Sequence, residues 1–288
     1  MDPQGGRRRS EMTLVGEGRT AEILAWDEGR VLRLFRDGAS RGYALREMAV
    51  SRIVHETGIP SPAAYPAETD DGLVEIDGRL GFVMDRVEGP SMLRELTAKP
   101  WRLWRYAREF AELHRAMHSR TAAGLSSLRE RLHRVIDEVA ESIGAHAAAR
   151  VHAAVDVLPE GDAVCHGDFH PDNILMSERG PITIDWGPAK AGNPAGDVAW
   201  TVFLIRHGGT PPGMGPLQRV TLTLFRRLFL GAYLRAYLRG SDVTRRDIER
   251  WGPPIAVLRL GDGIPEEREL LLRIIWKALG STEDGRMA

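Results

Sequence analysis

The sequence has a single cysteine, only three lysines and no long apolar run. One cysteine, Cys165, excludes an intrachain disulfide and gives no sign of an oxidising compartment. No apolar segment follows the arginines at positions 7–9, and no run in the chain is long enough to span a bilayer. We therefore predict a cytoplasmic protein without a membrane partner.

The net charge is also small. A formal value of −1 argues against the broad basic surface that nucleic-acid binding requires, so we expect no nucleic-acid partner. The first lysine is Lys99, and every cation before it is an arginine. A chain of 288 residues with 43% hydrophobic and 27% charged residues has the composition of a globular protein and enough length for two lobes.

The character of the sequence changes along the chain. Residues 1–11 are polar and glycine-rich, and we predict a disordered tail there. Residues 12–85 consist of short apolar runs separated by turns, which indicates a small antiparallel sheet with one helix. Residues 86–288 follow mostly helical spacing, which indicates a large helical lobe.

Within the sheet region, the apolar runs 21–26 and 30–35 predict a hairpin, and residues 41–57 predict a helix. The glycines Gly16 and Gly18 precede a strand-like run and not a helix, so they do not match a dinucleotide-binding turn. They are typical of a hairpin that lies over phosphates, or of a flexible turn.

One arginine in the second strand of this hairpin has an unusual position. The period of two places Val31, Arg33 and Phe35 on one face, so Arg33 shares that face with apolar residues. Arg33 is either a solvated edge residue or a cation aimed into a cleft. Glu47, on the apolar line of the following helix, is either its partner or a solvated carboxylate.

The chemistry-bearing residues gather in one stretch between two apolar runs, His166-Gly167-Asp168-Phe169-His170-Pro171-Asp172-Asn173. A second apolar run follows and ends at Asp185. Acidic residues and an amide at the ends of strands suit a metal-assisted reaction. The spacing of Asp168, Asn173 and Asp185 matches the catalytic and metal loops of kinase-fold enzymes, with Asp168 as base and the other two as Mg²⁺ ligands.

Two other chemistries fit parts of the sequence. A serine hydrolase would use Ser40 in a G-x-S-x-G match, but the charged strand before it is unsuited to the core of a parallel sheet. A metallohydrolase would hold Zn²⁺ or iron and would leave the sheet lobe, its glycines and Asn173 without a role. Its ligands would be His166, Asp168, His170 and Asp185. His114 and His118 are also four residues apart, but their apolar face favours core packing.

The polar stretch, together with Ile184-Asp185-Trp186-Gly187, closely resembles the aminoglycoside phosphotransferase and choline-kinase-like family, over roughly residues 13–240. The resemblance implies an α+β, two-lobed protein-kinase-like fold, with a small antiparallel β N-terminal lobe that binds nucleotide and a large mainly-α C-terminal lobe for catalysis and substrate. It implies ATP and Mg²⁺ as cofactors and a small-molecule hydroxyl as the phosphoryl acceptor.

The resemblance also assigns roles to residues by position. It implies Asp168 as catalytic base, Asn173 and Asp185 as metal ligands, and His166, His170 and Asp197 as supports of the catalytic loop. The residues implied to bind nucleotide are Gly16, Gly18, Val31, Arg33, Glu47 and, at the hinge, Met84, Asp85 and Val87. Arg33 stands where the family usually has lysine, so a nucleotide-binding pseudokinase is the alternative function.

Overall fold

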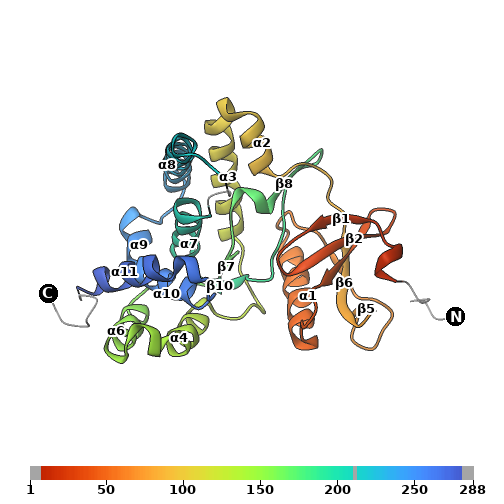
Figure 1. Ribbon diagram of the computed structural model, residues 1–288, viewed down its shortest axis with the longest axis horizontal. Coiled ribbons are helices and arrows are strands. Elements are labelled where there is room, and N and C mark those ends of the chain that lie inside the picture. The colour runs from red at the N-terminus through yellow and green to blue at the C-terminus, as the bar shows by residue number, and fades with distance from the viewer. Residues whose placement is uncertain (1–7, 210–212, 281–288) are drawn as a thin grey trace. The chain divides into compact units, whose positions relative to one another are not determined.

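The computed structural model describes residues 8–209 and 213–280 (Figure 1). The chain forms two compact units, which we call the first unit, Met1–Pro100 with Pro171–Pro188, and the second unit, Trp101–His170 with Ala189–Ala288. The first unit carries a small antiparallel sheet and the second is mostly helical, which confirms the predicted α+β class. No helix in the described part of the chain is long and apolar enough to cross a membrane.

The first unit is built on one antiparallel sheet. Its strands are β1 (Leu14–Glu17), β2 (Ala21–Asp27), β3 (Arg30–Phe35), β4 (Ala64–Tyr65), β5 (Val74–Ile76) and β6 (Arg79–Asp85). The order is β1-β2-β3-β6-β4, and β5 also pairs with β6. The apolar runs of the sequence account for every strand but β4, which has two residues and is too short to leave a periodic pattern.

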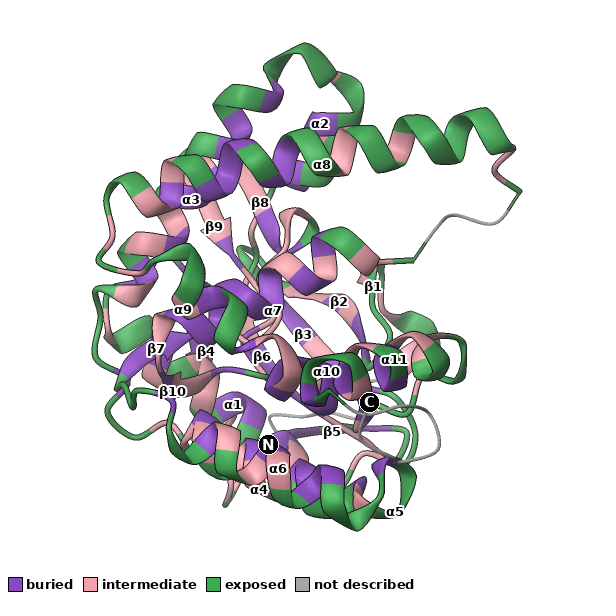
Figure 2. Ribbon diagram, turned by 90° about the vertical axis from the view of Figure 1, so that its left-hand side faces the viewer, coloured by how far each residue is buried: buried purple, intermediate pink, exposed green. Residues whose placement is uncertain are grey.

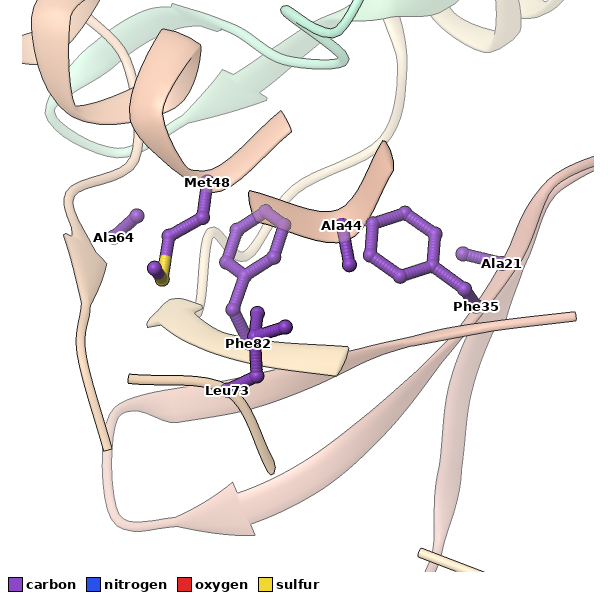
Figure 3. Packing of buried hydrophobic residues seen from close by; sticks show 7 residues of the cluster. All are labelled: Ala21, Phe35, Ala44, Met48, Ala64, Leu73 and Phe82. Carbon is purple, nitrogen blue, oxygen red and sulfur yellow. The ribbon is translucent and has the colours of Figure 1, made fainter. Parts of the chain in front are cut away.

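The two faces of this sheet bury different residues. Leu32 and Leu34 of β3 belong to one apolar cluster, whereas Phe35 belongs to the other. In the second cluster, Phe35 and Phe82 meet the helix α1 (Arg41–Glu56) at Ala44 and Met48 (Figure 3). The alternation predicted for β3 is therefore confirmed, and the face that carries Arg33 is the one that α1 covers.

The helix α1 has clear start and stop signals. The hydroxyl of Ser40 caps its first turn by accepting a hydrogen bond from the backbone N–H of Tyr43, at 3.2 Å. After Thr57 the chain leaves the helix through Gly58, whose φ of +79° favours glycine. These two ends fix the helix so that Glu47 becomes one of its buried residues.

The predicted tail is partly ordered. Arg9–Glu11 form one turn of 3₁₀ helix, and the Arg9 guanidinium pairs with Glu22 of β2 at 2.9 Å. Arg79 of β6 pairs with the same carboxylate at 2.6 Å. The prediction of disorder is therefore wrong for Arg9–Glu11, because the composition of this segment does not reveal its ion pair with Glu22 on another element. Residues 1–7 lie outside the described part.

The first unit also includes a segment from the middle of the helical half of the sequence. There η3 (Pro171–Asn173) leads into the hairpin of β8 (Ile174–Ser177) and β9 (Gly180–Thr183). Backbone hydrogen bonds run from Met176 N to Pro90 O and from Thr183 N to Pro60 O, at 2.9 and 3.0 Å. The helix α2 (Met92–Ala98) packs against this segment, so the division differs from the boundary expected between residues 85 and 86.

The second unit consists of helices around a two-stranded sheet of β7 (Ala163–Cys165) and β10 (Lys190–Gly192). Its helices are α3 (Leu103–His118), α4 (Leu128–Glu138), α5 (Ala140–Ile143), α6 (Ala145–Asp156), α7 (Pro194–His207), α8 (Pro216–Arg239), α9 (Arg245–Arg250), α10 (Gly252–Leu260) and α11 (Arg268–Leu279), with short 3₁₀ turns η2 (Pro100–Arg102) and η4 (Pro265–Glu267). Most of α7 is buried (Figure 2), including the polar residues Asp197 and Thr201.

Candidate functional site

Arg33 lies between two carboxylates of the first unit. Its Nη2 atom is 2.9 Å from Oδ1 of Asp185 and 3.2 Å from Oε2 of Glu47. Burial alone would lower the pKa of Arg33, but the charges of Asp185 and Glu47 raise it. The side chains of Arg33 and Glu47 are only 12% and 10% exposed, so Arg33 is a buried cation and not a solvated edge residue.

Glu47 is held from a second side by Tyr43, one turn earlier on α1. The Tyr43 hydroxyl donates a hydrogen bond of 2.6 Å to Oε1 of Glu47. Burial, together with this hydrogen bond to a carboxylate, raises the pKa of the Tyr43 hydroxyl, which therefore stays protonated and donates. Tyr43 was not predicted as a site residue, although its spacing of four from Glu47 on one helix was a signal.

Gly187 lies against the same carboxylate. A Cβ atom at this position would be 2.0 Å from Oε1 of Glu47, a distance that no side chain tolerates. Glycine therefore lets the backbone after Asp185 approach the buried Glu47. This close approach explains why the motif that begins at Asp185 ends in glycine.

The two predicted metal ligands both belong to the first unit. Asn173 is buried at the end of η3, and its carbonyl accepts a hydrogen bond from Ile184 N at 2.9 Å, which links it to the residue before Asp185. Asp185 has φ of +64°, a left-handed conformation that is rare outside glycine and clusters at functional sites. A carboxylate and an amide are hard oxygen donors, so this pair of residues fits Mg²⁺ by its chemistry.

The glycine turn joins β1 to β2. Gly16 lies on β1, and Gly18 N donates a hydrogen bond of 2.9 Å to Ala21 O. A Cβ at either glycine would meet only ordinary van der Waals contacts, at 3.6 Å or more. The fold by itself therefore tolerates a side chain at both positions, so the packing of the turn does not explain why both are glycine.

The predicted hinge residues lie at the end of β6. Met84 is the register partner of Val31 on β3. The side chain of Asp85 accepts hydrogen bonds from Ala63 N at 2.9 Å and from the Tyr65 hydroxyl at 2.8 Å. The Asp85 carboxylate therefore ties β6 to the β4 segment. Val87 follows the strand and is half-buried.

The predicted catalytic loop begins directly after β7, in the second unit. His166 is fully buried and Gly167 has φ of +74°, which favours glycine. Asp197 of α7 accepts both backbone N–H groups, from His166 at 2.7 Å and from Gly167 at 2.9 Å. The His166 ring accepts a third, because its Nδ1 lies 3.2 Å from Asp168 N. The loop backbone is thus held by two buried side chains.

Asp168 itself remains partly exposed. Its side chain is 33% exposed, and its Oδ2 atom lies 3.6 Å from Nε2 of His170, which is 31% exposed. The next loop residue, Phe169, is fully buried and stacks on Phe110 of α3 with ring centroids 4.3 Å apart. Its carbonyl accepts a hydrogen bond from the Thr201 hydroxyl at 2.9 Å. Anchors on both sides of Asp168 therefore fix the backbone that carries its carboxylate.

Two histidines of α3 complete the surroundings of Asp197. Nε2 of His114 and of His118 lie 3.1 and 3.2 Å from Oδ2 of Asp197. Each Nδ1 lies 2.7 Å from a tyrosine hydroxyl of α8, that of Tyr233 for His114 and that of Tyr237 for His118. A carboxylate only accepts, so both Nε2 atoms donate to Asp197, and in a neutral His114 ring Nδ1 then accepts from the Tyr233 hydroxyl.

The charges in this buried network follow from its hydrogen bonds. Burial, aided by the neighbouring His118, lowers the pKa of His114 to about 3, so the ring is neutral. Burial alone would raise the pKa of Asp197, but hydrogen bonds from His114 and His118 hold it well below its usual range. Among the described residues, this is the one cluster of three histidine or carboxylate groups close enough to share a metal ion. The network already gives each ring nitrogen a partner, which favours hydrogen-bonded support over metal binding.

The sequence could not reveal this network. His114 and His118 repeat at a spacing of four, and so do Tyr233 and Tyr237. Each repeat alone indicates only a buried face of one helix. Only the packing of α3 on α8 pairs the two repeats.

Ser40 shows no feature of a nucleophile. Its hydroxyl caps α1, its backbone φ of −72° is unstrained, and the preceding strand β3 pairs antiparallel with both neighbours. A nucleophile elbow requires a strained turn after a strand of an α/β-hydrolase sheet. The G-x-S-x-G match therefore marks the start of a helix.

Comparisons with known proteins find a matching family model and solved structures of similar fold. Residues 12–249 match the model of the phosphotransferase enzyme family. Among solved structures, the amicoumacin kinase hAmiN in complex with AMP-PNP, Ca²⁺ and Ami is 12% identical with a TM-score of 0.59, covering 93% of this chain and 87% of that one. A choline/ethanolamine kinase family protein from Mesorhizobium loti is 15% identical with a TM-score of 0.58, covering 98% and 91%. A thermostable mutant of aminoglycoside phosphotransferase APH(4)-Ia is 16% identical with a TM-score of 0.54, covering 94% and 95%. A search of curated protein sequences finds no match.

Proposed function

Since the chain belongs to the phosphotransferase enzyme family, we propose that it transfers the γ-phosphoryl group of ATP to a hydroxyl group of a small molecule, with Mg²⁺. The observation that carries the proposal is the buried ion pair of Arg33 with Glu47 and Asp185. A strand cation paired with a helix carboxylate, next to the metal-loop aspartate, is the arrangement that positions ATP in kinases.

Each residue then has a defined task. Asp168 orients the acceptor hydroxyl and takes its proton as the oxygen attacks the γ-phosphorus and ADP leaves. Asn173 and Asp185 would hold Mg²⁺, which supplies positive charge to the phosphate oxygens when it is bound. Arg33 adds a fixed positive charge in the first unit, and the glycine turn at Gly16 and Gly18 offers backbone N–H groups to the phosphates.

The neighbouring structures support a small-molecule acceptor. They include an amicoumacin kinase, a choline/ethanolamine kinase family protein and an aminoglycoside phosphotransferase. These names cover unlike classes of compound, so the proposal for this chain extends to the reacting hydroxyl and no further.

A nucleotide-binding protein without transfer activity is the second candidate. The observation that favours it is the contact of Arg33 with Asp185, because a carboxylate engaged by arginine has to leave that partner before it binds a metal. The variant Arg33→Lys separates the two candidates. Under the phosphotransferase proposal, Arg33→Lys keeps activity within about tenfold of the parent. If the parent binds nucleotide without transferring phosphate, the smaller cation in Arg33→Lys is expected to produce activity that the parent lacks.

The test of the function is a turnover assay. ADP release is measured with the parent protein, ATP and Mg²⁺ over a panel of hydroxylated metabolites and antibiotics. Asp168→Ala is expected to lose at least about 100-fold in kcat for any acceptor that the parent uses. Asp162→Ala, at an exposed position before β7, serves as the matched control. Equal turnover by Asp168→Ala and the control would overturn the assignment of the base.

A further inference from the structure

A pair of histidines joins two helices of the second unit away from the residues discussed above. α4 and α6 pack side by side (Figure 1), with His133 on the first and His152 on the second. The Nδ1 atoms of the two rings lie 2.7 Å apart. The ring centroids are 5.0 Å apart and the ring planes differ by 8°. These values place the rings edge to edge in nearly one plane, with their Nδ1 atoms pointing at each other.

The other nitrogen of each ring faces a carboxylate on the opposite helix. Nε2 of His152 lies 3.0 Å from Oδ1 of Asp137, and Nε2 of His133 lies 3.2 Å from Oδ1 of Asp156. In each helix the histidine and the aspartate are four residues apart, so the two contacts cross between the helices and extend the histidine pair into a chain of four side chains.

The carboxylates decide where the protons are. A carboxylate only accepts hydrogen bonds, so each Nε2 carries a hydrogen and donates it. A neutral imidazole with a hydrogen on Nε2 has a bare lone pair on Nδ1. Two bare lone pairs 2.7 Å apart repel each other, so this arrangement requires a cation between them, either a proton or a metal ion.

We propose that His133 and His152 form a binding site for a divalent transition-metal ion of the type that prefers imidazole, such as Cu²⁺, Ni²⁺ or Zn²⁺. Histidines that ligate metals usually donate their other ring N–H to a carboxylate, as Asp137 and Asp156 allow here. The two carboxylate charges balance the two charges of the ion. Mg²⁺ prefers oxygen ligands, so this site is distinct from the proposed nucleotide metal site.

Binding needs a small movement of the rings. With metal–nitrogen bonds of about 2.0–2.1 Å, two ligands of a tetrahedral ion lie about 3.3 Å apart. The Nδ1 atoms therefore separate by about half an ångström, and both rings rotate so that their lone pairs point at the ion. Both histidine side chains are about 30% exposed, which leaves room for this rotation and lets water complete the coordination shell. In the exchange, one bridging proton leaves the pair for each metal ion that binds.

The consequence is a cross-link between α4 and α6. A ligand that binds only the folded protein raises its stability, so the metal is expected to raise the melting temperature. The helices are joined by side chains that lie outside the proposed phosphoryl-transfer site, and the inference therefore stands independently of the proposed function.

The test uses the full chain stripped of metals with a chelator and then titrated with Cu²⁺, without nucleotide. We expect one equivalent to bind with the electron paramagnetic resonance signature of two imidazole nitrogens, and the melting temperature to rise. His133→Ala and His152→Ala are each expected to lose both effects, and Asp137→Asn to weaken binding by about 10–100-fold. His146→Ala, an exposed histidine on α6, is the matched control and is expected to bind as the parent does.

Two results would overturn the proposal. One is equal Cu²⁺ binding by the parent and by the double variant His133→Ala/His152→Ala. The other is a melting temperature of the parent that responds to pH through these histidines but not to Cu²⁺, Ni²⁺ or Zn²⁺, which would show that a proton alone occupies the space between the rings. Circular dichroism of each variant checks that its helices are intact.

Discussion

Oδ2 of Asp197 lies 2.7 Å from the backbone nitrogen of His166, and both residues are buried. The same carboxylate accepts hydrogen bonds from two histidines and, through Oδ1, from Gly167. A single buried charge therefore connects α3, α7 and the loop that carries Asp168. Four N–H donors stabilise the charge, which would otherwise be costly in the interior.

Replacing this charge is expected to loosen the catalytic loop. Asp197→Asn keeps the shape, but its amide group presents hydrogens toward N–H donors. We expect a loss of about 2 kcal/mol in the free energy of unfolding and a fall in kcat of at least about 30-fold, with little change in nucleotide affinity. Urea unfolding, steady-state kinetics and calorimetric ATP titration measure the three quantities. Asp162→Asn is the exposed control, and a parallel loss of nucleotide affinity would contradict a role confined to the loop.

The tyrosines are predicted to act as donors to the histidines. Tyr233→Phe leaves Nδ1 of His114 without a partner in a fully buried place, which is expected to cost about 1–3 kcal/mol of stability. Tyr237→Phe is expected to cost less, since the side chain of His118 is 5% exposed and can accept from water. Chemical denaturation of both variants checks the order. Equal costs would show that exposure of the acceptor does not decide the effect.

His114 predicts how stability depends on pH. In the folded protein its pKa is about 3, and in the unfolded chain it returns to about 6.5, so between these values only the unfolded chain binds the proton. The free energy of unfolding is therefore expected to fall as the pH drops below about 6.5, by roughly 1.4 kcal/mol per pH unit from this group. His114→Gln cannot take up the proton, so its stability is expected to be lower at pH 7.5 but flatter below pH 6.5. Unfolding curves at pH 7.5, 6.5 and 5.5 measure both slopes, and identical slopes would refute the assignment.

Gly187 tests the ion pair of the first unit. Gly187→Ala places a methyl group at a position that Glu47 occupies, so Glu47 has to move away from Arg33 or the backbone after Asp185 has to retreat. We expect a loss of about 1–3 kcal/mol in stability and a loss of nucleotide affinity. Gly231→Ala is the matched control, because nothing lies within 4 Å of its Cβ position on α8. The control is expected to gain about 0.5–1 kcal/mol from helix propensity.

The sequence alone predicted the features that depend on local periodicity and spacing. The alternation of β3, the helix that carries Glu47 and the distances along the chain between Asp168, Asn173 and Asp185 follow from neighbouring residues. The family and the two-lobed fold were implied by the resemblance that the polar stretch carries, and the comparisons confirm both. The roles of the individual site residues stay predictions.

Only the tertiary structure decided which residues meet. The sequence allowed Arg33 to be either solvated or paired. In the structure it contacts Glu47 and Asp185, and these three residues come from three separate segments. The contact of His114 with Tyr233 spans 119 positions, and β8 and β9 join the first unit through backbone hydrogen bonds. Local patterns show which side of an element is buried, but a partner is chosen by packing across the whole unit. The convergence of His133 on His152 has the same origin, since two surface positions on separate helices meet only after folding.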